Sequence, residues 1–501
     1  MQAPVPAADY IAPQPALNDV AASAVLRAGA LPLGQKLAYS IGAFSESAVS
    51  SSLNIFLLFY VTTVCGLPGG LAGAALAAGL VVDAVADPLL GSISDSWRSR
   101  FGRRLPMMAV GLPLMLAAFV AIFSLPSGLS QTSLFLLLAA LSIALRVAVS
   151  TFNLPYLAVG AELSDDYAER SSITTWRWGA ATLGAVAAVV LGFVVFFKGD
   201  GGALNRAAYQ PFALTLSLPI LLFALIALGA VHATRKRQHP VPAGGQFLSR
   251  LLPELIEVFR NRSFQVLFVS AFLMFTAQGA ATVLGLHANT FFWRFNGAQI
   301  QLVTLAFALG LVIGAPLTGP IVKRMEKRTA FLAAGFGLTL MQAGPAGLRL
   351  LGLLPLQGQA LATAIAVGML VAGVMTTMAA IALISMLADA ADEHEHLFGA
   401  RREALYFAGW AFAGKASNGG GALIAGLVLQ AIAFPSGSGS HAAGAVSPAA
   451  ANWLGFFYGP GAAALSGVGL AVLFLYRLDR RAHAVIMGEL AVRRGLTGDK
   501  P

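Results

Sequence analysis

The sequence contains little cysteine and few charged residues. Its single cysteine, Cys65, excludes an internal disulfide framework and any metal cluster built from cysteines. Charged residues make up 11% of the 501 positions, whereas hydrophobic residues make up 57% and the mean hydropathy is +0.76. Soluble globular domains do not have this composition, so we expect a membrane protein that crosses the bilayer many times.

Several motifs of pumps and enzymes are also absent. There is no phosphate-binding GxxxxGK loop, so ATP-driven pumping has no support. The cluster DEHEH at residues 392–396 lacks the spacing of a zinc protease, and a solvated charge run explains it better than a metal site does. No nucleophile and base pair indicates an enzyme, and we expect no cofactor and no resident metal.

Apolar segments of about 20 residues or more, separated by Gly, Pro or charged residues, predict about twelve membrane helices. We expect these at residues 37–65, 70–95, 105–125, 132–160, 172–197, 211–232, 263–292, 298–322, 329–351, 357–389, 403–434 and 451–476. A charged loop at 233–262 separates two bundles of six helices, 37–232 and 263–476, and the tails are 1–36 and 477–501. Residues 1–36 lack the pattern of a signal peptide.

The net charge of +10 raises the possibility of nucleic-acid binding. The basic residues, however, lie in alternate loops, which is the positive-inside pattern of membrane proteins. We therefore expect no nucleic acid as partner, a multi-pass protein of the cell inner membrane, and both termini in the cytoplasm. Basic turns at Gly91–Pro106 and Gly319–Thr329 occupy the same place in each half. They indicate either two parallel repeats or simply two positive-inside loops.

Two carboxylates lie within the second predicted span. Asp83 and Asp87 are one helical turn apart, so both project from one face about 6 Å from each other. Pro88 has no N–H and therefore leaves the carbonyl of Ala84 free beside the acids. Because an ionised acid inside a bilayer costs about 3 kcal/mol or more, such residues are usually functional. The pair predicts a site for a coupling cation or a proton.

Four further charged residues, Glu46, Arg146, Arg177 and Lys415, lie at a comparable depth in other predicted spans. Together with the acid pair they give three acids and three bases, which can neutralise one another in a shared cavity. For Arg146 and Arg177 a purely structural salt-bridge network explains the charges as well as a functional role does. The ammonium of Lys415 is expected to compete with a bound cation for the acids.

Polar groups in the fourth and fifth spans are candidates for solute or cation binding. Ser150 and Asn153 precede Pro155 and offer neutral oxygens and an amide, although hydroxyls in membrane helices often bond only to their own backbone. Both explanations stay open. Trp176, beside Arg177, is a candidate for stacking on a sugar face.

Five segments carry a family resemblance: KLAYSIGAF at 36–44, DAVADPLLGSISDSWRSRFGRRLP at 83–106, NLPY at 153–156, ERSSITTWR at 169–177, and the stretch 385–415. They resemble the glycoside-pentoside-hexuronide:cation symporters, the melibiose permease group of the major facilitator superfamily. The resemblance implies an all-α polytopic fold with twelve transmembrane helices in two pseudosymmetric six-helix bundles. It also implies alternating access and uptake driven by Na⁺, H⁺ or Li⁺.

The resemblance also implies roles for individual residues. Asp83, Asp87 and Ser150 match cation ligands of the melibiose permease, Lys415 matches its lysine on helix eleven, and Arg177 matches an arginine near the sugar. Other positions depart from that pattern. Ser47 and Asn153 stand where the permease has two sugar-binding aspartates, Leu157 replaces its stacking tryptophan, and Ala86 replaces an amide beside the cation. Glu46 and Arg146 are additional charges.

We therefore expect a cation-coupled symporter for a sugar, glycoside or related small solute, which acts as a monomer among membrane lipids and is not an enzyme. The expected solute-binding residues are Glu46, Ser47, Asn153, Trp176 and Arg177, and the expected charge network is Arg146 and Lys415. The first alternative is a carrier of lysolipids or other amphipathic solutes, whose mark would be an apolar cavity with a lateral opening. A non-transporting membrane sensor is the second alternative.

Overall fold

The computed structural model describes residues 31–97, 99–198, 201–237, 256–399, 403–437 and 446–497. Within these ranges the chain is helical and contains no strand, which confirms the predicted all-α fold. Most of the predicted N-terminal tail and of the central loop, together with Arg98, Arg401, Arg402 and the last four residues, lie outside the described residues.

The first half of the chain contains six crossings. The first is divided into α2 (Leu33–Ser40), α3 (Ala43–Ser52) and two π-helical segments, η1 (Leu53–Leu57) and η2 (Tyr60–Val64). The others are α4 (Gly69–Ser96), α5 (Leu105–Ile122), α6 (Gln131–Glu162), α7 (Tyr167–Val190) continued by η3 (Leu191–Phe196), and α8 (Tyr209–Ala233).

The second half repeats this arrangement. Its helices are α10 (Arg262–His287) continued by η7 (Ala288–Phe292), α11 (Gly297–Arg324), α12 (Lys327–Leu350), α13 (Gly358–Phe398), α14 (Glu403–Ala431), and α16 (Pro448–Phe456) followed by η8 (Phe457–Gly461) and α17 (Ala462–Val472). A final helix, α18 (Arg480–Thr497), follows the last crossing.

Ten helices within the described ranges are long and apolar enough to cross a membrane. The two remaining predicted spans, 37–65 and 403–434, are helical as well. The first is split into short segments, and α14 has a polar, glycine-rich centre around Lys415 that lowers its hydropathy. The chain is thus a multi-pass membrane protein.

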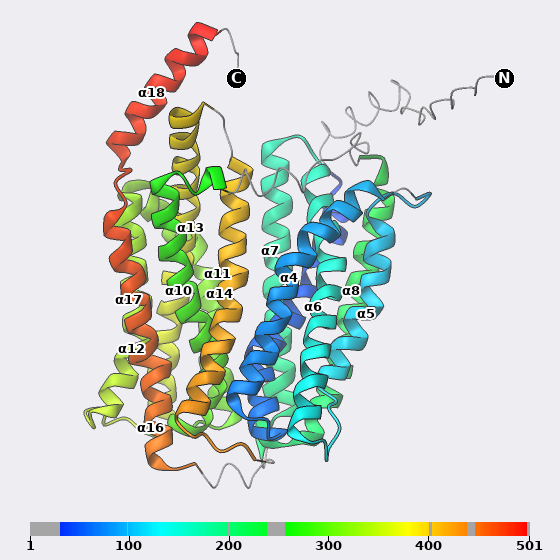
Figure 1. Cartoon of the computed structure of the whole chain (residues 1–501), viewed down its shortest axis with the longest axis vertical. Coiled ribbons are helices and arrows are strands. Elements are labelled where there is room, and N and C mark those ends of the chain that lie inside the picture. Colours follow the sequence, from blue (N-terminus) through cyan, green and yellow to red (C-terminus); the bar gives the residue numbers. More distant parts are fainter. Residues whose placement is uncertain are drawn as a thin grey trace, which may run out of the picture.

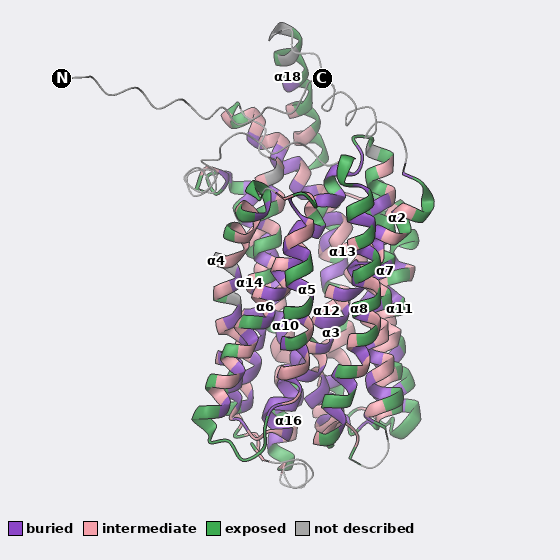
Figure 2. Ribbon diagram, turned by 90° about the vertical axis from the view of Figure 1, so that its right-hand side faces the viewer, coloured by how far each residue is buried: buried purple, intermediate pink, exposed green. Residues whose placement is uncertain are grey.

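The two halves stand side by side in Figure 1, with the helices of the first half in blue to green and those of the second in green to red. Helix α4 of the first half contacts α14 of the second, and α7 contacts α11. Helices α2 and α18 lie at the same end of the bundle, which we call the terminal end, and the opposite end is the far end (Figures 1 and 2).

Glycines bring α4 and α14 together toward the far end. A Cβ atom on Gly69 would lie 2.6 Å from the carbonyl oxygen of Gly426, and one on Gly73 would lie 3.1 Å from the Cα of Gly426. Any larger side chain at Gly69 would therefore have to push the helices apart, since real Cβ contacts are longer than this. The close approach holds the two halves together at this level.

The helices carry exposed as well as buried residues (Figure 2), and the exposed ones include many large apolar side chains. On α8, one face is exposed and the opposite face is buried. The exposed face carries Leu214, Leu218, Leu222 and Leu225, and the buried face carries Phe212, Leu216, Ile220 and Ala224. An apolar outer face at helical spacing is what contact with lipid requires.

The first crossing bends between α2 and α3, at Ile41 and Gly42. A Cβ atom on Gly42 would lie 2.7 Å from the Cβ of Ala227 and 2.8 Å from the ring of Tyr156. The crossing therefore packs tightly against α6 and α8 at the bend. Glu46 of α3 follows one turn after this contact.

Candidate functional site

The acid pair occupies one face of α4 near the middle of the bundle. The Ser150 hydroxyl of α6 donates a hydrogen bond of 3.0 Å to Oδ1 of Asp83. Asp83 is buried, with 6% of its surface exposed. Oδ1 of Asp87 is also buried and accepts no hydrogen bond from the residues that the structure describes. Asp83, Asp87 and Ser150 therefore come together as the sequence predicts.

Lys415 reaches this pair from the other half of the molecule. Its ammonium forms an ion pair and hydrogen bond with Oδ2 of Asp87. It also lies 3.8 Å from Oδ2 of Asp83. The Lys415 side chain is 48% exposed, so it is in contact with solvent while it bridges the halves.

Arg146 approaches the pair from α6. Its guanidinium Nη1 lies 3.7 Å from Oδ2 of Asp83. The side chain crosses α4 at Gly79, where a Cβ atom would lie 2.8 Å from Cδ of Arg146. The glycine one turn before Asp83 therefore makes room for the arginine that partly balances its charge.

Glu46 belongs to the same electrostatic network. Ser50 donates a hydrogen bond of 2.8 Å to Oε1 of Glu46, and the carboxylate lies within the electrostatic range of Lys415 and Arg177. The structure records no pairing of Glu46 with Arg146 within the described ranges. Lys415 and Arg146 thus pair with the two aspartates. Glu46 interacts electrostatically with Lys415 and Arg177, so the predicted acids and bases gather in one part of the bundle.

Two tyrosines support Arg177, and the sequence analysis did not identify them. The guanidinium of Arg177 lies 5.2 Å from the centre of the Tyr156 ring, a cation–π geometry. Tyr156 stacks on Tyr39 at 4.7 Å, and each hydroxyl donates to the other residue's carbonyl, at 3.0 and 2.6 Å. This reciprocal pair ties the first crossing to α6 beside the charge cluster.

Three predicted solute-binding residues, Ser47, Asn153 and Trp176, make no specific side-chain contact with the charged residues in the described ranges. Ser47 and Asn153 are half-buried, and the structure records no hydrogen bond of their side chains within the described ranges. Trp176 is 46% exposed and has no recorded ring contact with another described residue. Their proposed role depends on the solute and stays a prediction.

Two arginines of the basic loop after α4 form buried ion pairs, in addition to indicating the orientation in the membrane. Arg103 and Arg104 are buried, and both pair with Glu162 at the end of α6, Arg104 at 2.6 Å. Arg104 also pairs with Asp95 at 2.9 Å. We did not predict these ion pairs from the sequence, although Glu162, a single acid at the end of an apolar span, was an available signal.

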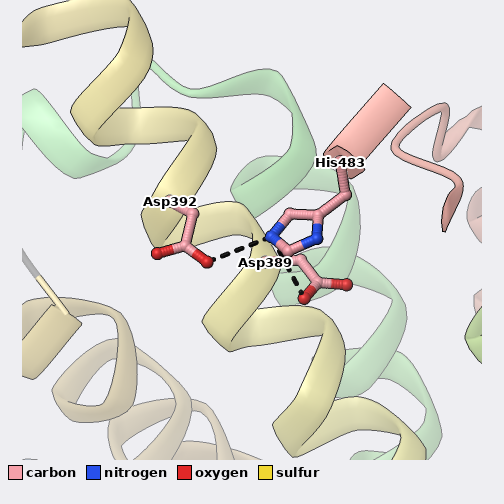
Figure 3. A group of neighbouring side chains, drawn as sticks. All are labelled: Asp389, Asp392 and His483. Carbon is pink, nitrogen blue, oxygen red and sulfur yellow. Dashed lines mark hydrogen bonds and ion pairs between the residues drawn. The ribbon is translucent and has the colours of Figure 1, made fainter. Parts of the chain in front are cut away.

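The second half has its own charge cluster at the terminal end (Figure 3). The imidazole of His483 on α18 lies 3.0 Å from Asp392 and 3.6 Å from Asp389 on α13. Lys327 donates to both oxygens of Asp389 at 2.7 Å. These residues can approach within metal-ligand distance, but the lysine already neutralises one carboxylate. Asp392 therefore attaches α18 to the bundle rather than standing in a solvated charge run.

An apolar cavity of about 750 Å³ lies between the two halves. Thr182 and Val186 of α7 line it from the first half, and residues of α11 and α13 line it from the second. Because Leu309, Val312 and Val367 in its lining are largely exposed, the cavity opens at the side of the bundle.

The described residues have the fold of solved transporters. The crystal structure of the nucleoside transporter NupG has the same fold, with a TM-score of 0.57 and 15% identity over 88% of this chain and 100% of that one. Residues 38–480 match the MFS/sugar transport protein family, and the chain belongs to this family. It is a transporter and not an enzyme, as predicted.

Similar proteins include symporters and transporters named for different solutes. An uncharacterized symporter of Synechocystis sp. is 31% identical over 221 residues, which cover 43% of this chain and 40% of that relative. The isoprimeverose transporter of Lactiplantibacillus pentosus is 24% identical over 425 residues, 82% of each chain. The sphingosine-1-phosphate transporter of Mus musculus is 25% identical over 429 residues, 81% of this chain and 82% of that relative. The relatives thus include a sugar transporter and a lipid transporter.

Proposed function

We propose that the protein is a cation-coupled symporter that moves a sugar, glycoside or related small solute across the cell inner membrane by alternating access. The contact that carries this proposal joins the two halves: Lys415 pairs with Asp87 and lies 3.8 Å from Asp83. Na⁺ or H⁺ binds at Asp83 and Asp87, with the Ser150 hydroxyl as a neutral ligand. Apart from this transported ion, the protein requires no cofactor.

Coupling follows from competition for the carboxylates. An arriving cation or proton takes the oxygens that the Lys415 ammonium occupies, so the lysine must withdraw. Withdrawal breaks an ionic connection between the halves and allows them to rock past the site. Because linkage is reciprocal, the ion then raises solute affinity by about 1–3 kcal/mol, and the solute raises ion affinity by the same amount.

The charge balance of the cluster bears on the solute. Asp83, Asp87 and Glu46 balance Arg146, Arg177 and Lys415, so a bound cation leaves one positive charge in excess. A solute with one negative charge, such as a sugar acid, restores neutrality where an uncompensated charge would be costly. Once released from the acids, Lys415 binds the negative group of the solute together with Arg177. Ser47, Asn153 and Trp176 contact the rest of the solute.

The proposed orientation puts the terminal end in the cytoplasm, since the basic clusters Arg103–Arg104 and Lys323–Arg324 lie there. The far end then faces the outside. The halves contact each other closely at Gly69, Gly73 and Gly426 toward the far end, and this supports assigning the structure to an inward-facing state in the proposed orientation. One chain supplies both halves of the site, and the protein works as a monomer surrounded by lipid.

A second candidate is a carrier of an amphipathic solute such as a lysolipid. The lateral apolar cavity between α7, α11 and α13 favours it, because an acyl chain can enter such a cavity from the bilayer. A head group with one net negative charge suits the same charge cluster, and one relative carries sphingosine-1-phosphate. The two candidates thus share the ion site and differ in the apolar part of the solute.

Uptake into proteoliposomes with an imposed Na⁺ or H⁺ gradient tests both. The panel contains a neutral glycoside, a glucuronide and a lysophospholipid, each radiolabelled. We expect gradient-driven accumulation that Asp83→Asn or Asp87→Asn abolishes, whereas Glu489→Gln on α18, an exposed acid outside the cluster, leaves it intact. Accumulation that both variants retain would refute the ion site, and movement of the lysophospholipid alone would establish the second candidate.

A further inference from the structure

A buried histidine joins the halves at the far end. His287, the last residue of α10, has no exposed surface. Its Nε2 lies 3.0 Å from the hydroxyl of Thr62 on η2, across the boundary between the two halves. The ring packs against Phe59 of the first half at 4.9 Å and against Phe434 of the second at 5.6 Å.

The hydrogen bonds of Thr62 fix the tautomer of this histidine. The Thr62 hydroxyl donates its one hydrogen to the carbonyl oxygen of Leu58 at 2.7 Å. It can therefore only accept from His287, whose Nε2 must carry the hydrogen. The other ring nitrogen, Nδ1, is then an unprotonated acceptor, and it is buried without a hydrogen-bond partner within the described ranges.

The surroundings offer no counter-charge to a protonated ring. The described groups in contact with it, Thr62, Phe59 and Phe434, do not ionise. On the first crossing, the ring of Tyr60 packs against Tyr209, and Cys65 interacts electrostatically with Arg206; both partners belong to the first half.

Among the described residues, the helices packed against α10 place no charged side chain in contact with the ring either. The other ionisable residue of α10 is Arg262, at the opposite end of that helix. Lys415 of α14 is committed to the acid pair. A proton added to Nδ1 in this closed state would therefore be a buried, unpaired charge, which is strongly unfavourable.

We propose that His287 is a proton-binding site, separate from the acid pair, and that proton binding from outside opens the closure at the far end. When the halves separate there, the ring meets water and binds a proton as a free imidazole does. When they close, the ring must be neutral. External acid thus favours the outward-facing state. The inference rests on the proposed transport cycle and orientation, but it concerns the gate rather than the solute.

The expected size of the effect follows from simple linkage. A free imidazole is half protonated near pH 6.5, and a ligand shifts an equilibrium only through the state that binds it. The ratio of outward-facing to inward-facing molecules should therefore increase about tenfold between pH 8 and pH 5.5.

A spin-label distance measurement gives this ratio and does not require transport of a solute. Ser127 and Gln357 are exposed in far-end loops of opposite halves, and Ser127→Cys with Gln357→Cys in a Cys65→Ser background gives a spin-label pair. We expect the ratio of long-distance to short-distance populations to rise about tenfold on acidification in the full-length protein. A change of less than about twofold would overturn the proposal, whether or not the protein transports the solutes of the uptake panel.

Variants separate His287 from other titrating groups. His287→Gln keeps a donor for Thr62 but cannot ionise, so the acid response should disappear. Thr62→Val removes the hydrogen bond but keeps the imidazole, so the response should persist. Asp83→Asn and Asp87→Asn should also retain it, because the acid pair is a different site. A tenfold response retained by His287→Gln would show that another group is the sensor.

Discussion

Removal of the Lys415 ammonium tests the proposed competition directly. At 3.8 Å from Asp83, the ion pair corresponds to about 4 kcal/mol at an effective dielectric constant of about 20. The lysine side chain is 48% exposed, so solvent screening reduces this value substantially. We take about 1–2 kcal/mol as the part that a competing cation must overcome, which corresponds to a factor of about 5–30 in affinity.

Lys415→Ala should therefore tighten cation binding about 5–30-fold. Solute accumulation should fall, because without the lysine ammonium the cation no longer breaks an ionic connection between the halves. Calorimetric titration of the purified protein with NaCl and LiCl measures this affinity. If the coupling ion is H⁺, the midpoint of ion-dependent exchange should move to higher pH, because removal of a nearby positive charge makes the carboxylates bind protons more tightly.

Two controls define the outcome. Lys415→Arg keeps the charge and should change cation affinity much less than Lys415→Ala does. Lys323→Ala removes a positive charge at the end of α11, away from the acid pair, and should leave the affinity unchanged. If Lys415→Ala binds the ion no more tightly than wild type, the lysine does not compete with it, and the proposed coupling mechanism is wrong.

Two further predictions concern the supports of the site. Glu162→Gln leaves Arg103 and Arg104 buried without a full counter-charge and should lower the free energy of unfolding by about 3–5 kcal/mol. Asp95→Asn should cost less than about 1 kcal/mol, because Asp95 is 56% exposed, and equal losses of thermal stability in detergent would contradict this assignment. Gly79→Val should displace Arg146 from Asp83 and tighten cation binding several-fold in the same titration. Gly91→Val, on the same helix with open space around it, should not.

The acid pair could be predicted from the sequence because helix geometry alone determines it. Residues four apart on an apolar helix share a face, so Asp83 and Asp87 had to project together, and Gly79 lies on the same face one turn earlier. The count of crossings also followed from hydropathy, but the division of the first span into short segments did not. Gly42 lies at the first interruption, and its close contacts with Ala227 and Tyr156 come from distant segments.

The contacts of the site could not be derived from helix geometry alone. Comparable depth in the membrane and the family resemblance led us to expect Lys415 near the acids, but its contact with them depends on glycine packing between α4 and α14, two helices far apart in sequence. Likewise, the sequence predicts only that Arg103 and Arg104 lie in a cytoplasmic loop, and their role depends on the ion pairs with Glu162. His287 was a lone histidine in an apolar span, and its meaning depends on the contact with Thr62 from the other half.

The contacts between the halves suggest a division of roles along the bundle. At mid-depth the connection is the ion pair between Lys415 and Asp87, and in the proposed mechanism a cation that binds the acids displaces Lys415 and removes it. Closer to the far end the helices meet through glycines, which permit close packing without a charge. At the far end the connection is the contact between His287 and Thr62. If both proposals hold, an ion from outside separates the halves at the far end by protonating His287 and at mid-depth by binding the acids, so opening and coupling respond to ions at two separate positions.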